Sequence, residues 1–277
     1  MNVISFLLEQ GYKPALLSRG YKGKWEKKGA SLSDGRSILG SWEDSGDEAF
    51  MIAQNIPQAG IFIGKNRLHS SKRATRSGFN VGVLDDGFQH RILHRDMDIV
   101  LYDLSQKAAL REPFSSLKRA HLLLVKKKDE SNRKKEIKKD LSKKAFFEYS
   151  VISKGFFRLG EKGEKVSAER IRGKKVIAFC GIARPERFHS LLQEEGIYPK
   201  FFLKFPDHHP YPQSSLEKIL KYFFKVEAEV LIMTEKDAVK VVDKINPRKI
   251  PAYYLKIDLE VEKEFYPAVL SVIQNMD

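Results

Sequence analysis

Short apolar runs alternate with segments of helical periodicity along the first half of the chain. The runs lie at 14–21, 59–64, 79–86, 96–104 and 120–127, and several of them end in polar residues. A continuous apolar run is typical of a strand that is buried on both faces of a sheet. Strands of this kind that alternate with helices indicate a parallel sheet with helices on both faces. We therefore predict an α/β fold.

The polar and apolar spacing also predicts the helices of this half. Apolar residues in 3–8 recur at helical spacing, and Gly11 supplies the end of that helix. The segment 41–55 has the composition of a second helix, with Ser45 or Asp47 as its N-cap. An open α/β domain normally begins with a strand whose carboxyl end carries the nucleotide loop. This sequence begins inside a helix instead.

The second half repeats the alternation on a smaller scale. The segment 146–167 predicts two strands around a glycine-containing turn, and 173–197 predicts a strand, a loop and a helix. Further strands are expected at 201–206, 229–237 and 252–258, with an amphipathic helix at 215–225. We predict three parts: an N-terminal domain over 1–148, a two-stranded, hairpin-like linker over 149–172 and a smaller α/β domain over 173–277.

The composition limits the possible partners and the location of the protein. The 277 residues carry a formal net charge of +14, which attracts polyanions such as nucleic acid, nucleotide phosphates or an anionic membrane surface. The lysine-rich stretch 126–144 is interpreted as a solvated helix and loop. No apolar stretch reaches the roughly 20 residues that span a bilayer, and the N-terminus is too polar for a secretory signal. A cytoplasmic location follows as the expectation.

Missing motifs are informative as well. The single cysteine, Cys180, excludes an internal disulfide and a cysteine-based metal cluster, and we place it in the core. Neither a GxxxxGK[ST] loop nor a GxGxxG loop is present, so neither standard phosphate cradle can be assigned.

The most informative segment is VLDDGFQHR, residues 83–91. Asp85 and Asp86 directly follow an apolar run, and ligand sites in open α/β sheets lie at the carboxyl ends of strands. A carboxylate there can hold Mg²⁺, as in phosphate-transferring enzymes. Gly87 allows a sharp turn, and Gln89 and His90 add polar groups at the same edge. The alternative is a helix N-cap followed by surface residues.

Basic and acidic residues elsewhere allow two readings each. In SRGYKGK, residues 18–24, Arg19 and Lys22 either bind phosphate or form a basic turn. In GDEAF, residues 46–50, Asp47 and Glu48 start a helix, where a carboxylate either caps the helix or acts as a general base.

Two segments in the second half also allow two interpretations each. In FPDHHPY, residues 205–211, His208 either tunes another catalytic group or belongs to a surface loop. In MTEKDAVK, residues 233–240, Thr234, Lys236 and Asp237 either contact a nucleotide or cap the next helix.

Taken in order, these motifs resemble the tetraacyldisaccharide 4′-kinase family, the lipid A 4′-kinases. The matching segments are LLSRGYKGK, SGDEAF, LDDGFQHRILHRDMDIVL, LREPFSSLKRAHLLLVKK, FCGIARPERF, FPDHHPY and MTEKDAVK. The resemblance implies a P-loop-NTPase-like fold and transfer of the γ-phosphoryl group of ATP to the 4′-hydroxyl of a tetraacyldisaccharide 1-phosphate. It also implies a peripheral position on the cytoplasmic, anionic face of the inner membrane.

The resemblance assigns roles to individual residues. Asp47 is similar to the family's catalytic carboxylate and His208 to its partner. Asp85 and Asp86 resemble the pair that serves Mg²⁺.

The remaining site residues take substrate or phosphate roles by the same resemblance. They are Arg19, Arg67, Glu48, Gln89 and His90.

The sequence departs from the family at its start. The family's strand and its GGxGKT loop, the Walker A motif, have no counterpart before the opening helix. Either the polypeptide is longer than these residues, which we favour, or the chain has weak or no kinase activity. The alternative function is a non-catalytic basic protein that binds RNA or a membrane. A nucleic acid partner is not expected, because the sequence has no RNA-binding signature.

Overall fold

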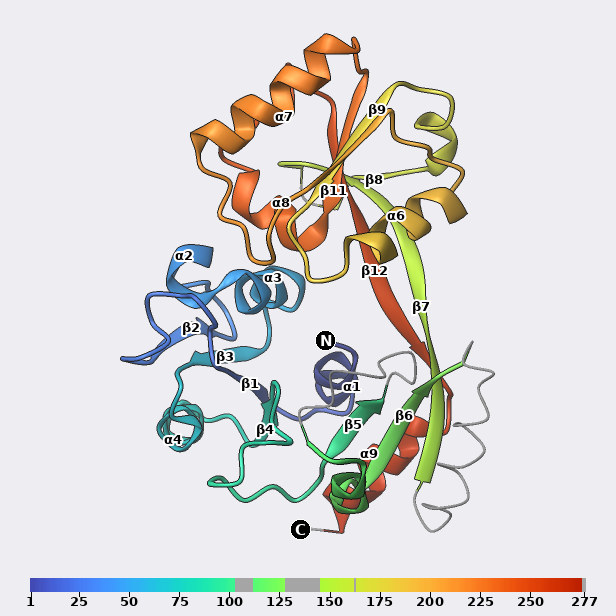
Figure 1. The fold of residues 1–277 in the computed structure, drawn as a ribbon. Coiled ribbons are helices and arrows are strands. Elements are labelled where there is room, and N and C mark those ends of the chain that lie inside the picture. The colour runs from blue at the N-terminus through green and yellow to red at the C-terminus, as the bar shows by residue number, and fades with distance from the viewer. Residues whose placement is uncertain (103–111, 128–144, 162, 276–277) are drawn as a thin grey trace.

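A computed structural model describes residues 1–102, 112–127, 145–161 and 163–275 of the chain (Figure 1). Its elements form two sheets. The small sheet has the strand order β2-β3-β1-β4. Its strands are β1 (Pro14–Ser18), β2 (Ala30–Asp34), β3 (Gly60–Ile63) and β4 (Val81–Leu84). Strands β3, β1 and β4 run parallel and β2 is an antiparallel edge strand, so the strands predicted in this region are confirmed. Strands β1 and β3 are buried, whereas β4 is only partly buried.

Helices of the first half pack against the small sheet. They are α1 (Asn2–Glu9), α2 (Trp42–Ser45), α3 (Asp47–Asn55) and α4 (Arg67–Arg76). Ile4 of α1 and Ala49 and Ala53 of α3 join one core cluster with Leu16 and Ile61 of the sheet. Helices α3 and α4 both lie beside the small sheet (Figure 1).

The predicted helix over 41–55 is broken in two. Gly46 separates α2 from α3 because its φ of +85° lies in the left-handed region, which a continuous helix cannot contain. The predicted caps, Ser45 and Asp47, are wrong. Ser41 begins α2, where its N–H and hydroxyl both contact the Asp44 carboxylate, and Gly46 takes the cap position of α3. This break aims the first residue of α3 away from α2.

The large sheet has the strand order β10-β9-β11-β12-β7-β6-β5, with β8 attached to β7. Its strands are β5 (Ile99–Tyr102), β6 (Leu122–Lys126), β7 (Ala145–Arg158), β8 (Lys165–Val166), β9 (Val176–Cys180), β10 (Phe201–Lys204), β11 (Val230–Thr234) and β12 (Ala252–Val261). Parallel pairing holds within β10-β9-β11-β12 and within β7-β6-β5, and β12 meets β7 in the antiparallel sense. The mostly parallel α/β fold class is confirmed.

Helices cover the large sheet on its upper and lower parts. They are the 3₁₀ turns η1 (Phe114–Arg119) and η2 (Ala168–Arg170) and the helices α6 (Pro185–Glu194), α7 (Gln213–Lys225), α8 (Glu235–Val241) and α9 (Phe265–Gln274). Helix α7 shows how the pattern works, because it buries Leu216, Ile219 and Phe223 at helical spacing against Phe179 of β9. None of the helices in the described ranges is long and apolar enough to cross a membrane.

Strands β7 and β12 form a long antiparallel ribbon that links the upper and lower parts of the molecule (Figure 1). The predicted pair of strands around a glycine-containing turn is present: Phe156 of β7 pairs with Val166 of β8, and Gly160 and Gly163 lie between the two strands. Strands β5 and β6, predicted from the first half, join the large sheet rather than β4: β6 pairs with β7 through Leu122 and Ala145, and β5 pairs with β6. The hydrogen bonds of the large sheet therefore run across positions 148 and 172, and the three-part division stays a prediction. Most of the lysine-rich stretch, 128–144, lies outside the described residues.

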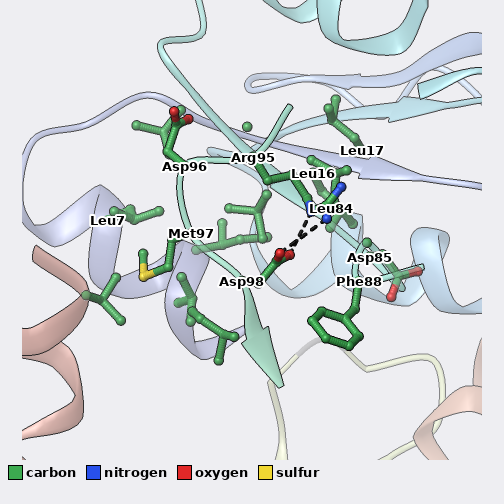
Figure 2. Close-up of a pocket in the computed structure, with 18 of the residues that line it drawn as sticks. Leu7, Leu16, Leu17, Leu84, Asp85, Phe88, Arg95, Asp96, Met97 and Asp98 are labelled. Atoms are coloured by element: carbon green, nitrogen blue, oxygen red, sulfur yellow. Dashed lines mark hydrogen bonds and ion pairs between the residues drawn. The ribbon is translucent and has the colours of Figure 1, made fainter. Parts of the chain in front are cut away.

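A cavity of about 1040 Å³ separates β4 from β5 (Figure 2). Apolar side chains from several elements line it, among them Leu7, Leu17, Leu84 and Met97. Within the described residues, β4 pairs only with β1 and β5 only with β6, so each strand has one edge without a strand partner. The two sheets are thus separate at this position.

Candidate active site

A second cavity, of about 960 Å³, lies at the carboxyl ends of β1 and β4 and extends to the loop at 205–211. We call it the site cavity. Every site residue predicted from the sequence lines it, from both halves of the chain: Arg19, Asp47, Glu48, Arg67, Asp85, Asp86, Gln89, His90 and His208. The structure brings these residues together, and the role of each remains a prediction.

Asp85 follows β4 and is fixed to the neighbouring strand. Its N–H donates to the Leu17 carbonyl over 3.2 Å, and its carboxylate accepts a 3.1 Å hydrogen bond from the Ser18 hydroxyl. Burial and the nearby charges of Asp86 and Glu48 raise the pKa of Asp85. Asp86 holds a φ of +52°, which is uncommon for a residue with a Cβ. Closely placed carboxylates at a strand end form an edge that attracts cations.

Arg67 supplies a fixed positive charge beside these carboxylates. It is the first residue of α4, and its side chain is buried. Its guanidinium donates to the Gly64 carbonyl over 2.5 Å and to the Asp85 carbonyl over 3.4 Å. Its Nε is buried with no hydrogen-bond partner in the structure. A buried donor without a partner is costly, so this group is suited to an acceptor such as a phosphate oxygen.

Arg19 lines the site cavity and is paired within its own loop. Its Nε lies 2.6 Å from Glu26 Oε1, and about half of its side chain is exposed. The backbone at Gly20 turns with a φ of +66°, where a Cβ would lie 2.4 Å from the Ile63 side chain. Lys22, next in this loop, donates to the Asp207 carbonyl over 3.3 Å. The loop therefore touches both halves of the site.

Gln89 and His90 are held on the loop that follows Asp86. Arg95 organises this loop: its guanidinium pairs with the Asp98 carboxylate at 2.6 Å and donates to the Leu93 carbonyl over 3.0 Å. It also donates to the His90 carbonyl. The Nδ1 atom of His90 is buried with no partner in the structure. This loop gives the cavity a second orphaned polar atom beside that of Arg67.

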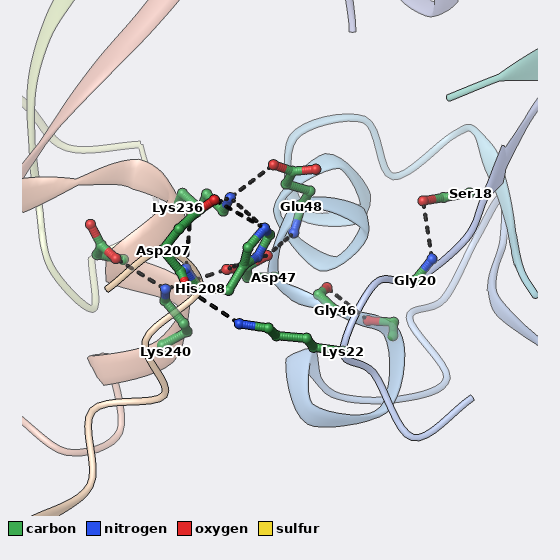
Figure 3. Close-up of polar contacts among 12 residues, drawn as sticks. Ser18, Gly20, Lys22, Gly46, Asp47, Glu48, Asp207, His208, Lys236 and Lys240 are labelled. Atoms are coloured by element: carbon green, nitrogen blue, oxygen red, sulfur yellow. Dashed lines mark hydrogen bonds and ion pairs between the residues drawn. The ribbon is translucent and has the colours of Figure 1, made fainter. Parts of the chain in front are cut away.

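Asp47 and His208 meet although 161 residues separate them (Figure 3). His208 Nδ1 lies 2.9 Å from Asp47 Oδ1 and 3.1 Å from Oδ2, and the Glu48 N–H donates to Oδ1 over 2.9 Å. Burial favours the neutral acid, but the hydrogen bond from His208 and the charges of Lys236 and Lys240 outweigh it and lower the pKa of Asp47. A buried carboxylate kept ionised in this way can serve as a base.

Sequence reasoning missed two groups of the site, one at Asp47 and one at Asp85. Lys240 is almost fully buried, and its ammonium donates to Asp47 over 3.3 Å. The Ser18 hydroxyl was also missed as the partner of Asp85. The one available signal for Lys240 was a lysine inside the otherwise apolar run AVKVV. Of the two readings of 233–240, Thr234 takes the cap role, since its hydroxyl accepts from the Asp237 N–H.

Among the described residues, no group of three or more His, Cys, Asp or Glu side chains is arranged to hold a metal ion. This does not conflict with a magnesium site at Asp85 and Asp86. Mg²⁺ in phosphate-transferring enzymes is commonly bound through one or two carboxylates, with substrate phosphates and water as the other ligands.

Comparisons with known proteins agree on one family. The family model described as Tetraacyldisaccharide-1-P 4'-kinase matches residues 1–274. The tetraacyldisaccharide 4'-kinase of Syntrophus aciditrophicus is 33% identical over 292 residues, which cover 97% of this chain and 78% of that protein. The enzyme of the same description from Desulfotalea psychrophila is 36% identical over 255 residues, which cover 86% and 72%.

A solved structure gives the same result for the fold. The crystal structure of LpxK from Aquifex aeolicus in complex with ATP matches with a TM-score of 0.74 at 26% identity. The match covers 98% of this chain and 82% of that chain. It confirms the kinase-type α/β fold predicted from the order of the motifs.

Proposed function

Because the chain belongs to the tetraacyldisaccharide-1-P 4'-kinase family, we propose that it phosphorylates the 4′-hydroxyl of tetraacyldisaccharide 1-phosphate, a lipid A precursor, using ATP. One observation carries the proposal to this chain's own residues. The ionised Asp47 carboxylate and the Asp85–Asp86 pair line the same cavity. A base and a pair of carboxylates suited to a phosphate-bound metal ion are therefore adjacent. Phosphoryl transfer needs these two components more than it needs covalent catalysis.

The chemistry assigned to Asp47 is proton removal. As the 4′-oxygen forms a bond to the γ-phosphorus, the bond from that phosphorus to the ADP oxygen breaks and ADP leaves with its electron pair. The proton of the hydroxyl passes to the Asp47 carboxylate. The His208 ring, 2.9 Å from that carboxylate, holds its orientation.

Asp85 and Asp86 would hold Mg²⁺, which neutralises charge on the phosphate oxygens when it is bound. The donor set fits a hard cation, since it consists of carboxylate oxygens with the Ser18 hydroxyl beside them. Burial and the charges of Asp86 and Glu48 raise the pKa of Asp85 and outweigh the opposite effect of the Arg67 charge. The orphaned Nε of Arg67 is suited to a phosphate oxygen at the same edge.

The family's GGxGKT loop has no counterpart in these 277 residues. We therefore propose that these residues alone transfer phosphate more slowly than the Syntrophus relative does. Rates measured side by side on the same acceptor test this, and equal rates would contradict it.

The remaining proposal concerns location. The net charge of +14 supports peripheral binding to an anionic, cytoplasmic membrane surface. Binding to vesicles that contain anionic lipid is expected to fall steeply as salt rises, because salt screens surface charge. Binding that does not change with salt would contradict it.

The main test is transfer from γ-labelled ATP to tetraacyldisaccharide 1-phosphate. Asp47→Asn keeps the side-chain shape and removes the base, so the rate is expected to fall by about 10²–10⁴-fold. The matched control is Asp243→Asn, which changes an exposed carboxylate just beyond α8 and should leave the rate unchanged. Undiminished transfer by Asp47→Asn would overturn the proposed role.

A further inference from the structure

Helix α8 places one lysine against each member of the Asp47–His208 pair (Figure 3). Lys240 Nζ lies 3.3 Å from Asp47 Oδ2, and Lys236 Nζ lies 3.3 Å from His208 Nε2. Residues four positions apart lie on the same face of a helix. A single helical face therefore contacts the carboxylate and the imidazole together.

These contacts determine where the imidazole proton lies. His208 Nδ1 lies 2.9 Å from a carboxylate oxygen of Asp47, and a carboxylate can only accept a hydrogen bond. His208 Nε2 faces the ammonium of Lys236, which can only donate. The nearest carboxylate oxygen of Asp207 is 3.7 Å from Nε2, beyond hydrogen-bond distance. The consistent assignment is a neutral ring with its proton on Nδ1.

Lys236 is charged in this arrangement. Burial lowers the pKa of Lys236, but the charges of Glu48, Asp47 and Asp207 outweigh burial, and the net pKa is raised. Its Nζ lies 2.8 Å from Glu48 Oε1. Lys236 therefore remains an ammonium that donates to Nε2.

Lys240 holds the other side of the pair. Its side chain is only 1% exposed, and its ammonium lies between Asp47, at 3.3 Å, and Asp237, at 3.0 Å. Asp237 is itself anchored, because its Oδ2 accepts from the Thr234 hydroxyl over 2.6 Å and from the Gly181 N–H over 3.1 Å. Lys240 thus ties Asp47 to the ends of two strands of the large sheet.

We propose that Lys236 and Lys240 are positioning residues that keep the shared proton on His208 Nδ1 and leave the Asp47 carboxylate unprotonated. The inference rests on the proposed function, in which that carboxylate takes the proton of the acceptor hydroxyl. A carboxylate can accept this proton, whereas a carboxylic acid cannot. The charged groups around the pair are Glu48, Asp207, Lys236, Asp237 and Lys240, with Lys22 at the Asp207 carbonyl. The phenols of Tyr21 and Tyr211 lie near His208 and Lys240, respectively.

The first test reads the ring directly and needs no activity. In the full chain with ¹⁵N-labelled histidine, His208→Gln identifies the signals of His208. The wild-type ring is expected to carry hydrogen on Nδ1 only near neutral pH. In Lys236→Met, the ring is expected to carry protons on both nitrogens, because Asp47 and Asp207 then face it without the ammonium. A wild-type proton on Nε2, or an unchanged spectrum in Lys236→Met, would overturn the assignment.

The second test is the pH dependence of kcat/KM. Lys240→Met is expected to lower kcat/KM about tenfold on the acidic side, with recovery at alkaline pH, because Asp47 then binds its proton more readily. Lys240→Arg keeps the charge and should restore most of the acidic activity. A loss that is equal at every pH would indicate a structural role only and would overturn the proposal.

A control variant and a separate failure test complete the design. Lys244→Met removes a nearby lysine that donates to the carbonyls of Pro210 and Tyr211 and not to the pair, so it should leave the profile in place. Full transfer activity in Asp47→Asn would overturn the proposed function. A loss in Asp47→Asn together with a pH-independent effect of Lys240→Met would overturn only the role of the lysines.

Discussion

The Ser18 hydroxyl donates to the Asp85 carboxylate over 3.1 Å, which joins the ends of two adjacent parallel strands at the edge of the site cavity. Ser18 is buried, and its hydroxyl also accepts a long hydrogen bond of 3.4 Å from the Gly20 N–H. The hydroxyl therefore orients the carboxylate and connects it to the loop that carries Arg19.

Ser18→Ala is expected to weaken magnesium binding. Without the hydroxyl, Asp85 loses the hydrogen bond that favours its ionised, correctly oriented form, and loss of such a supporting partner typically costs about 10–100-fold in metal affinity. The magnesium concentration that gives half-maximal phosphate transfer should rise accordingly. Ser77→Ala, at an exposed helix end, is the control. An unchanged magnesium requirement in Ser18→Ala would contradict this role.

Asp85→Asn is expected to stabilise the metal-free protein at neutral pH. The pKa of Asp85 is raised in the folded state, so the ionised form is more costly there than in the unfolded chain. The gain in the free energy of unfolding should be complete above the raised pKa of Asp85. It should vanish as the pH falls below the ordinary carboxyl pKa, where Asp85 is protonated in both the folded and the unfolded chain. A rise in Tm of about 2–4 °C corresponds to ~1 kcal/mol in a protein near this size. Melting curves in the presence of a chelator measure it, and a lower Tm at neutral pH would contradict it.

Gly20→Ala is expected to destabilise the protein more than Gly78→Ala does. Both glycines have positive φ, +66° and +82°, so both substitutions incur the left-handed penalty of about 1–2 kcal/mol. Only at Gly20 would the new Cβ meet other atoms, 2.4 Å from Ile63 and 2.8 Å from the Ser45 carbonyl oxygen, and overpacking adds about 1–3 kcal/mol. Urea unfolding of the two variants compares them, and equal losses would refute the close contact.

Cys180 is expected to resist alkylation in the folded protein. Burial, with a smaller effect from Asp237, raises the pKa of its thiol to about 12, and the thiolate is the reactive form. The side chain is fully buried in β9. Iodoacetamide near neutral pH should react at a rate set by unfolding, while the urea-unfolded chain reacts quickly. Equal rates in the two states would show that the strand opens readily.

The local elements were predictable because each depends on a short stretch of sequence. The opening helix, the strand before Ser18 and the strand before Asp85 each carry a pattern of apolar residues that is complete within a few positions. The ligand site at the carboxyl ends of the strands was predictable in the same way, because its carboxylates directly follow a strand in the sequence. The site cavity therefore contains the residues that the motifs indicated.

Features that depend on long-range pairing could not be predicted. Nothing near Leu122 signals that its strand pairs with β7 instead of β4, because parallel pairing carries little local pattern. The burial of Lys240 depends on Asp237, one turn earlier in its own helix, and on Asp47 of α3, which is far away in the sequence. Lysine is ordinarily exposed, so the residue type alone would predict that the Lys240 side chain lies at the surface, whereas it is buried.

The β7–β12 ribbon determines which parts of the chain share one hydrogen-bonded sheet. Strands β5 and β6 belong to the first half of the sequence, yet their hydrogen bonds fasten them to the ribbon and so to the sheet that carries α8. Helix α3, which packs on the small sheet, carries Asp47 and meets α8 through polar contacts, such as the one between Asn55 and Glu235 at 2.9 Å. The boundary between the two hydrogen-bonded sheets therefore falls between β4 and β5, and the contact between Asp47 and His208 bridges segments that pack on different sheets.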